Sequence, residues 1–368
     1  MKICLYSPYL PDHFGGGEKY LLDVATVFEK NNHCVFVAIT SAEPLSAARL
    51  GIIKKSYEQF LGHSLKSVSF INTPIRSKTT FIKRLLWTRQ FDVLFYITDG
   101  SLFFSLARNN IVHIQIPLKL DKSSFFEKIK LKNWQTKISN SNFTKKIIEK
   151  SWPTTINYVH QPMVDTEEFI HGLNLAKKEP IILNVGRFFP QLHSKRQDIL
   201  VEIFKRLVDK YKKETKGWHL ILIGSIEDEA YALKVKKAAQ GYPITLLHKV
   251  SHQDLVNWYQ RSSIYWHATG YRIDEEVEPH KVEHFGISTV EAMAAGNVPM
   301  VIVKGGQAEV IGKEFANWQW LTQRDCIKKT RQLIKNDQLR LKLQQQAQQR
   351  ATQFGPAIFE EKLMKMIA

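Results

Sequence analysis

The sequence predicts an α/β protein made of two Rossmann-like halves. Its 368 residues, 44% of them hydrophobic, exceed what one ordinary core holds and suit two domains. The chain opens with a short apolar run, a glycine-rich turn, a helical pattern and a second apolar run, which is how a doubly wound parallel sheet begins. The same succession restarts near residue 180. Two sheets of parallel strands are therefore expected, one in each half.

The first half contains the signals of one complete unit. Residues 2–7 form a buried-strand run, and a helix follows in which Leu21, Leu22 and Phe28 recur at helical spacing. A second strand is predicted over residues 34–39. Further strands are predicted over residues 68–72, 93–97, 111–115, 137–139 and 155–159.

The second half begins with a strand at residues 180–187 and an amphipathic helix at residues 198–211. Later strands are predicted over residues 219–223, 244–246, 264–267 and 298–302. The segment between the halves is polar and lacks periodicity. We therefore predict a first domain at 1–165, a linker at 166–179, a second domain at 180–350 and a final helical segment at 351–368 that packs back on the first domain.

The composition narrows the class of protein. The sequence has no apolar run of about 18 residues and no signal-peptide pattern at its start, so we expect a cytoplasmic protein that neither spans a membrane nor is secreted. Cys4, Cys34 and Cys326 are scattered and lack CxxC spacing, which argues against a disulfide framework and a zinc site. The acidic run at residues 274–276 is interpreted as solvated carboxylates, so no metal is expected.

The charge predicts an anionic partner. The chain has 52 Lys and Arg against 35 Asp and Glu, a formal net charge of +17. Residues 76–89 mix cations with Phe81, Leu86 and Trp87, which indicates either peripheral contact with an anionic membrane or a helix that packs its apolar face into the core. Residues 119–150 are also rich in lysine. A nucleic-acid partner is not expected, because no recognised nucleic-acid module is present.

The segment EHFGISTVEAMAAG at residues 283–296 carries the strongest functional signal. It reads as a loop with a glycine followed by a helix, with Ser288 as the expected N-cap. Free amide groups and the helix dipole at such a helix start favour a phosphate. Glu283 and Glu291 lie on either side of this turn, and carboxylates accept hydrogen bonds from sugar and ribose hydroxyls. From spacing alone, two structural glutamates explain the pattern equally well.

This segment resembles the paired-glutamate motif of the family 4 glycosyltransferases. Thr269-Gly-Tyr upstream and Gly305-Gly-Gln downstream resemble the same family in order and spacing. The resemblance covers nearly the whole chain. It implies a GT-B architecture, in which two Rossmann-like domains face each other across a cleft. The first domain would bind the acceptor, the second would bind a nucleotide-diphosphate sugar, and the reaction would retain the anomeric configuration.

The resemblance also implies roles in the second half. Glu291 would bind the donor ribose and Glu283 the transferred sugar, and the main chain of Phe285, Gly286 and Ile287, with Ser288, would lie against the sugar and diphosphate. Arg187 and Lys195 would place two cations on the diphosphate and stabilise its leaving charge. The loop at residues 188–194 is longer than in many relatives, so Arg196 is an alternative to Lys195. No metal and no cofactor would then be required.

In the first half, Gly16 and Gly17 belong to a glycine loop at residues 14–18 that resembles the family's phosphate-cradling loop. The loop lacks a GxGxxG pattern, which argues against a nicotinamide-dependent dehydrogenase. His113, in the segment HIQIP, resembles a family histidine that orients a hydroxyl or shares the acceptor proton. A buried structural histidine is the alternative interpretation. Asp99 ends another predicted strand and is a weaker candidate for the same cleft.

Together these observations predict a metal-independent, retaining glycosyltransferase. It would move a hexosyl group from a UDP- or GDP-sugar to a hydroxyl of a glycan or lipid-linked acceptor, with Glu283, Arg187, Lys195 and His113 as catalytic residues. Two other functions remain compatible with the sequence, namely an inactive sugar-nucleotide-binding subunit and a basic nucleic-acid-binding protein.

Overall fold

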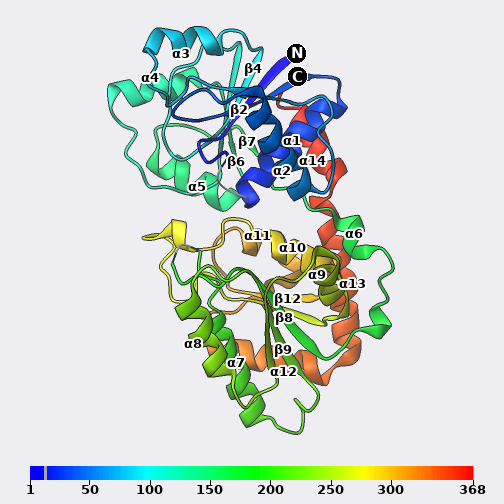
Figure 1. Ribbon diagram of the computed structural model, residues 1–368. Helices are drawn as coiled ribbons and strands as arrows, with labels where there is room; N and C mark the ends of the chain where they lie inside the picture. Colours follow the sequence, from blue (N-terminus) through cyan, green and yellow to red (C-terminus); the bar gives the residue numbers. More distant parts are fainter. Residues whose placement is uncertain (12–14, 192, 368) are drawn as a thin grey trace. The chain divides into compact units, whose positions relative to one another are not determined.

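The computed structural model describes residues 1–11, 15–191 and 193–367 and divides the chain into two compact units. The first unit comprises Met1–Met163 with Phe359–Ala368, and the second comprises Val164–Ile358. Each unit is a parallel sheet with helices on both faces (Figure 1). Two α/β units are what the sequence predicts. Within the described residues, no helix is both long enough and apolar enough to cross a membrane.

The first unit contains a seven-stranded parallel sheet in the order β3-β2-β1-β4-β5-β6-β7. Its elements are β1 Lys2–Tyr6, α1 Gly16–Lys30, β2 Cys34–Ile39, α2 Ala47–Leu61, β3 Ser69–Asn72, α3 Phe81–Thr88, β4 Val93–Thr98, β5 Asn109–Ile114, α4 Phe125–Asn133, β6 Thr136–Ser139, α5 Asn142–Ser151, β7 Tyr158–Val159 and, from Phe359 onward, α14 Pro356–Met364. The strand order reverses between β1 and β4. In such sheets ligands bind outside the carboxyl ends of the strands at this reversal.

The first unit has a hydrophobic core on each face of its sheet. One core includes Tyr20 and Phe28 of α1, and the other includes Trp134 and Trp152. Strand β4 is buried along its whole length, as expected for a central parallel strand that reads as one apolar run. The predicted strand at residues 155–159 is shorter in the structure, where only the two residues of β7 pair with β6 at the edge of the sheet.

The end of the chain completes the first core. Phe359 and Leu363 belong to it, and the carbonyl of Phe359 lies 3.0 Å from Nε2 of His160. Lys30 of α1 makes an ion pair with Glu360 at 2.6 Å. Packing of the last residues within the first unit thus involves both apolar burial and specific polar contacts.

The second unit contains a five-stranded parallel sheet in the order β10-β9-β8-β11-β12. Its elements are α6 Thr166–Ile170, η1 Leu175–Lys177, β8 Ile181–Val185, α7 Gln197–Lys210, β9 His219–Ile223, α8 Glu229–Ala239, β10 Ile244–Leu247, α9 His252–Arg261, β11 Ile264–His267, η2 Pro279–Lys281, α10 Ile287–Ala294, β12 Val298–Val301, α11 Gln307–Ile311, η3 Lys313–Trp318, α12 Gln323–Lys335, α13 Asp337–Ala351 and η4 Thr352–Phe354. Residues 166–179, where the sequence predicts a linker, form α6 and η1 and belong to this unit. Phe169 of α6 is buried in its core, which explains why this polar segment is ordered.

Candidate active site

The loop before α10 forms a helix start with open amide groups. The N-cap is Gly286, whose φ of 103° lies in the left-handed region that glycine adopts without strain. The N-cap prediction for Ser288 is wrong, since Ser288 is the second residue of the helix. Gly286 has no side chain to cap the helix, and the amides of Ile287 and Ser288 make no hydrogen bond within the described chain. This helix start can therefore receive an anion.

The second glycine motif holds this loop in place. The amide of Gly306 donates to the carbonyl of Glu283 at 2.8 Å. A Cβ atom on Gly306 would lie 1.8 Å from the carbonyl oxygen of His284, and one on Gly305 would lie 2.2 Å from that of Glu283. Only glycine allows the two loops to approach this closely. Gly305-Gly-Gln is thus required for the shape of the loop that carries Glu283.

Lys195, Glu283 and His267 form a mostly buried polar cluster. Nζ of Lys195 lies 2.5 Å and Nε2 of His267 lies 2.9 Å from the same carboxylate oxygen of Glu283. The Lys195 and Glu283 side chains are 16% and 13% exposed, and His267 is fully buried. Burial raises the pKa of Glu283, but the charge of Lys195 and the His267 hydrogen bond outweigh it and hold that pKa well below its ordinary value. Glu283 is therefore an ionised carboxylate beside a fixed cation.

Further basic side chains lie beside this cluster. The rings of His193 and His284 meet edge to face at 4.5 Å, and Nδ1 of His193 lies 3.4 Å from the carbonyl of Val282. Burial lowers the pKa of both imidazoles. The charge of Glu283 raises the pKa of His193, and the charges of Lys195 and Arg187 lower it. A Cβ atom on Gly186 would lie 2.5 Å from Cγ of Lys195, so Lys195 packs against the residue that precedes Arg187. The structure thus brings Arg187, Lys195 and Glu283 together, as their assignment to one site requires.

The two candidate cations differ in how firmly they are held. Arg187 is about 40% exposed, and its only ion pair in the described chain is a 3.4 Å contact with Glu227. Lys195 is held tightly by Glu283. Arg196, the alternative to Lys195, makes two hydrogen bonds with Asp198 at 3.0 and 3.2 Å. Of Lys195 and Arg196, Lys195 is therefore the better placed, because it contacts Glu283. The exposed side chain of Arg187 can turn toward an anion.

Two buried tyrosines orient the polar side chains of α10. The hydroxyl of Tyr259 donates to Glu291 at 2.7 Å, and burial raises the pKa of that hydroxyl well above its ordinary value. The hydroxyl of Tyr265 lies 2.8 Å from Oγ of Ser288. Phe285 has its ring in the core against Phe354, so only its main chain is available to a ligand. Glu291 is thus a carboxylate fixed from beneath by a protonated phenol.

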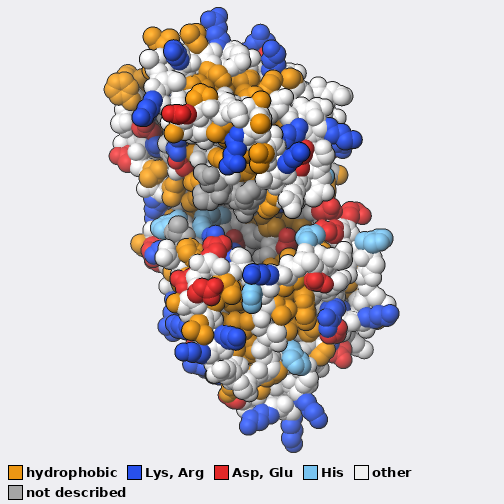
Figure 2. All heavy atoms as spheres, viewed as in Figure 1, with side chains coloured by type: hydrophobic (Ala, Val, Ile, Leu, Met, Phe, Trp, Pro, Cys, Tyr) orange, Lys and Arg blue, Asp and Glu red, His pale blue; other side chains and the backbone are white. Residues whose placement is uncertain are grey.

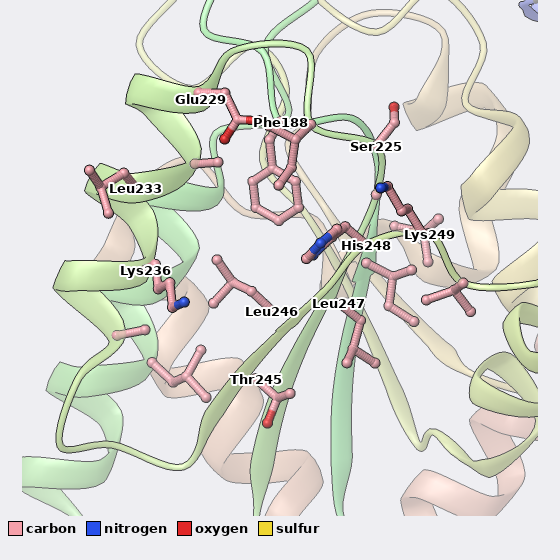
Figure 3. A pocket seen from close by; sticks show the side chains of 18 of the residues that line it. Phe188, Ser225, Glu229, Leu233, Lys236, Thr245, Leu246, Leu247, His248 and Lys249 are labelled. Carbon is pink, nitrogen blue, oxygen red and sulfur yellow. The ribbon is translucent and has the colours of Figure 1, made fainter.

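A large pocket opens at the carboxyl ends of β8, β9 and β10, where parallel sheets bind ligands (Figure 3). Its volume is about 1080 Å³. Phe188, Ser225 and His248 line the end where the strands finish, and the pocket continues along α8 past Leu233. Gly224 keeps this end compact, because a Cβ atom there would lie 2.0 Å from the carbonyl oxygen of Gly186. The pocket can therefore take a planar ring between apolar walls.

The glycine loop of the first unit is arranged differently from the start of α10. Gly16 and Gly17 are the first residues of α1, and Phe14 lies outside the described residues. The carboxylate of Glu18 accepts a hydrogen bond from the amide of Gly15 at 3.0 Å, so an anion already occupies this helix start. A Cβ atom on Gly17 would lie 2.7 Å from Oε1 of Gln115. The glycines therefore permit close packing here, and the neighbouring carboxylate disfavours a phosphate.

His113 lies in the first unit, on β5, and is fully buried. Its ring stacks on Tyr20 at 4.1 Å, and the hydroxyl of Tyr20 lies 2.5 Å from Nδ1 of His160. Burial holds the pKa of His113 well below its ordinary value, so the imidazole is neutral. Its Nε2 atom is buried and has no hydrogen-bond partner in the described chain. Gly16, Gly17, His113 and the weaker candidate Asp99, which pairs with Arg76, thus belong to one unit, and the other predicted site residues belong to the second.

The comparison with protein families decides between the candidate functions. Residues 165–350, half of the chain, match the model of the glycosyl transferases group 1 family, and this range contains the whole α10 site. The chain belongs to that family. It is therefore an enzyme, a glycosyltransferase.

Solved structures show that this glycosyltransferase has the GT-B architecture. A glycosyltransferase from Rickettsia africae superposes with a TM-score of 0.72 at 16% identity, over 100% of this chain and 97% of the other. HepE from Anabaena, solved in complex with UDP, superposes with a TM-score of 0.69 at 16% identity, over 99% of each chain. At these identities the likeness establishes the fold.

A curated relative is similar over a shorter stretch. The GDP-Man:Man(3)GlcNAc(2)-PP-Dol alpha-1,2-mannosyltransferase of Neurospora crassa is 24% identical over 159 residues. The match covers 39% of this glycosyltransferase and 26% of that protein, so the chain spans about a quarter of the curated relative it matches.

Several residues of the site were not predicted. His267 ends a predicted strand, but its contact with Glu283 spans 16 residues and leaves no periodic signal. Tyr259 contacts Glu291 across 32 residues. His193 lies in the long loop before Lys195, whose residue 192 is outside the described part of the chain. Polar residues at strand ends, here His267 and His248, are the one signal that points to some of them.

Proposed function

We propose that this glycosyltransferase is a retaining enzyme that moves a hexosyl group from a UDP- or GDP-sugar to a hydroxyl of a glycan or lipid-linked acceptor in the cytoplasm. The observation that carries the proposal is the start of α10. Two amides there make no hydrogen bond within the described chain, and the preceding loop carries Glu283, which is paired with Lys195. A donor diphosphate fits this position, because helix dipole, amides and cation all favour negative charge.

The rest of the donor follows from the neighbouring groups. Glu291, oriented by Tyr259, would accept hydrogen bonds from the ribose hydroxyls. The pocket beside Phe188 and His248 would hold the base between apolar walls. Glu283 would accept from hydroxyls of the transferred sugar, since its carboxylate is ionised and mostly desolvated. UDP bound to HepE and the GDP-mannose in the name of the Neurospora enzyme make both bases worth testing.

In the proposed reaction the bond between the anomeric carbon and the diphosphate oxygen breaks. The acceptor hydroxyl oxygen bonds to the anomeric carbon on the same face, and its proton passes to a diphosphate oxygen. The leaving diphosphate gains negative charge as the bond breaks, and Lys195, Arg187 and the α10 amides stabilise that charge more than they stabilise the intact donor. These groups would supply the stabilisation that a divalent cation provides in other enzymes, so we propose that no metal is required.

Assignment of His113 to the acceptor step is part of the proposal. Its imidazole is neutral and has a buried, unpaired Nε2 atom. A neutral imidazole can accept a hydrogen bond from an acceptor hydroxyl and orient it. Because Tyr20 covers the ring, such contact would require the ring of Tyr20 to move.

Thermal-shift titration with UDP, GDP and ADP in the presence of EDTA tests the donor site. One nucleotide at a hundred times its Kd should stabilise the fold by about 2.7 kcal/mol, which raises the midpoint of a unit of this size by about 5–10 °C. Arg187→Ala and Glu291→Ala should lose most of the shift, whereas Arg206→Ala, an exposed arginine paired with Glu202, should keep it. If no nucleotide shifts the folded native protein, the donor-site assignment is wrong, and a shift that appears only without EDTA overturns metal independence.

A further inference from the structure

Two helices of the first unit turn apolar side chains to solvent. Helix α3 buries only Thr88 and helix α4 buries only Leu131. On α3, Ile82 is 67% exposed, and on α4, Phe125 and Phe126 are 73% and 69% exposed. A helix on the surface of a domain normally directs its apolar face to the core. Leu131 of α4 and Trp87 of α3 do pack on the core, but most of the other apolar side chains of these helices face solvent, which calls for a partner.

A loop joins the two helices into one surface. The ring of Phe104 packs edge to face on Phe81 at 6.2 Å, and the amide of Leu106 donates to Oγ1 of Thr88 at 2.9 Å. The same loop reaches α4, because Ser105 and Asn133 exchange two hydrogen bonds at 2.8 and 3.0 Å. The α3–α4 surface, as we define it, comprises the exposed side chains of Phe81, Ile82, Leu86, Leu106, Phe125, Phe126 and Ile129.

The concentration of apolar side chains on this surface is high. Of the 17 large hydrophobic side chains that are exposed in the described part of the chain, seven lie here. In Figure 2, hydrophobic and basic side chains are intermingled over the region of the first unit that Figure 1 labels α3 and α4. Scattered exposed hydrophobic residues need no explanation, but a contiguous group marks an interaction surface.

The charges around the α3–α4 surface are positive. Five exposed cations there make no ion pair within the described residues: Lys78, Lys83, Arg89, Lys128 and Lys132. The acidic side chains nearby are already engaged. Glu127 pairs with Lys122 and Lys130 at 2.6 Å each, Asp99 pairs with Arg76, and Asp121 accepts from the amide of Ser123. The partner of this surface must therefore offer both apolar volume and negative charge.

We propose that the α3–α4 surface binds the surface of an anionic lipid bilayer, with Phe125 and Phe126 entering the interface and the lysines lying among the head groups. Exposed aromatic residues flanked by lysine and arginine are what such binding requires. A duplex nucleic acid, with its bases already stacked, would use the cations but would leave the phenylalanines in water. The proposal uses neither the donor site nor the catalytic residues, and it places the main apolar contacts on α4, outside the segment 76–89 that the sequence singles out.

Co-sedimentation of the full chain with lipid vesicles tests the proposal. The protein should bind vesicles that contain phosphatidylglycerol at low salt, bind them less at high salt, and bind vesicles of phosphatidylcholine alone weakly. The double variant Phe125→Ser/Phe126→Ser should reduce partitioning by about tenfold or more for each ring removed. Its matched control is Ile52→Ser/Phe60→Ser on α2, which removes two side chains that are 54% and 39% exposed elsewhere in the same unit.

A second pair of variants isolates the charge. Lys128→Gln/Lys132→Gln should weaken binding to anionic vesicles by about fivefold for each lysine and leave the weak binding to phosphatidylcholine unchanged. Lys212→Gln/Lys213→Gln changes the net charge equally on the second unit and should bind like the native protein. Circular dichroism and nucleotide-induced thermal shifts, unchanged in all four variants, would show that fold and donor site are intact.

Three results would overturn the proposal. The first is failure of the folded native chain to bind anionic vesicles at low salt. The second is native partitioning of the Phe125→Ser/Phe126→Ser variant. The third is retention on duplex DNA that is tighter than vesicle binding and indifferent to the phenylalanines, which would make the surface a polyanion site instead.

Discussion

Replacing Lys195 with methionine should reveal how strongly the second unit depends on the Lys195–Glu283 pair. The charged atoms are 2.5 Å apart, and the side chains are only 16% and 13% exposed, so solvent screens the pair weakly. Breaking a buried pair from one side costs about 3–5 kcal/mol, because the remaining charge stays buried without compensation. Glu283 keeps its hydrogen bond from His267, so we expect the lower end, about 3 kcal/mol.

Substitution of Glu283, the other member of the pair, should lower the free energy of unfolding by less. Glu283→Gln leaves Lys195 without its partner, but the long lysine side chain can move its ammonium group to water, so we expect about 1–2 kcal/mol. The double variant Lys195→Met/Glu283→Gln should lose less stability than the sum of the two single losses, and the difference is a coupling energy of about 2 kcal/mol. Lys234→Met, an exposed lysine on α8, is the control and should change stability by less than about 0.5 kcal/mol.

Scanning calorimetry is the appropriate assay, because two units can unfold in separate transitions. For a unit spanning residues 164–358, a loss of about 3 kcal/mol lowers the midpoint by about 6–12 °C. If the stability lost in the double variant equals the sum of the two single losses within about 0.5 kcal/mol, the residues are not coupled and the reasoning fails.

The same variant should respond to pH in a defined direction. In the native protein the pKa of Glu283 is depressed, so its contribution to stability is complete above the unfolded value of about 4.3 and is lost as pH falls below it. In Lys195→Met burial is opposed by His267 alone, so the pKa of Glu283 should rise and protonation should relieve the buried charge. The midpoint difference between variant and native protein should therefore be largest near pH 7 and shrink toward pH 4. A constant difference across this range would refute the charge-based explanation.

Two further variants test the loop and the ribose contact. Gly306→Ala should prevent folding of the second unit or lower its calorimetric midpoint by several degrees, because the new Cβ would lie 1.8 Å from the carbonyl oxygen of His284. Gly51→Ala, on α2 with nothing within 4 Å, should be neutral or stabilising by up to about 1 kcal/mol. Tyr259→Phe should keep the fold but weaken nucleotide binding about tenfold in calorimetric titration, since Glu291 loses a charged hydrogen bond. If Tyr259→Phe binds the nucleotide with native affinity, Tyr259 does not contribute to the donor site.

The strands of both sheets were predictable because buried parallel strands read as uninterrupted apolar runs. Residues 93–97 and 264–267 were predicted as strands on this basis, and β4 and β11 form there. The helix cap at α10 was not predictable from residue preference alone. Ser288 has the side chain that usually caps a helix, but the preceding Gly286 adopts φ of 103° and begins the helix two residues earlier. Preferences of single residues give way when the backbone must fit against Gly305 and Gly306.

The exposed helices show a second limit of sequence reasoning. Residues 81–88 form an amphipathic helix, as the pattern indicates, but a pattern does not say which face meets the core. For α4 the sequence showed only a stretch rich in lysine, and the exposure of Phe125 and Phe126 follows from the packing of Leu131 and Trp134 beneath the helix. Burial is decided by distant neighbours, which a local window of sequence does not contain.

The two glycine-marked helix starts show why electrostatics must complement motif reading. Both α1 and α10 begin at a glycine after a parallel strand region, and both were predicted to hold phosphate. At α1 the carboxylate of Glu18 already accepts the amide of Gly15, so a second anion would be repelled. At α10 the first turn contains no acidic residue, and Lys195 lies beside the loop. The N-cap backbones also differ, with φ of −141° at Gly15 and 103° at Gly286. A diphosphate is therefore favoured at α10, where Lys195 pairs with the carboxylate of Glu283, and disfavoured at α1, where the carboxylate of Glu18 occupies the helix start.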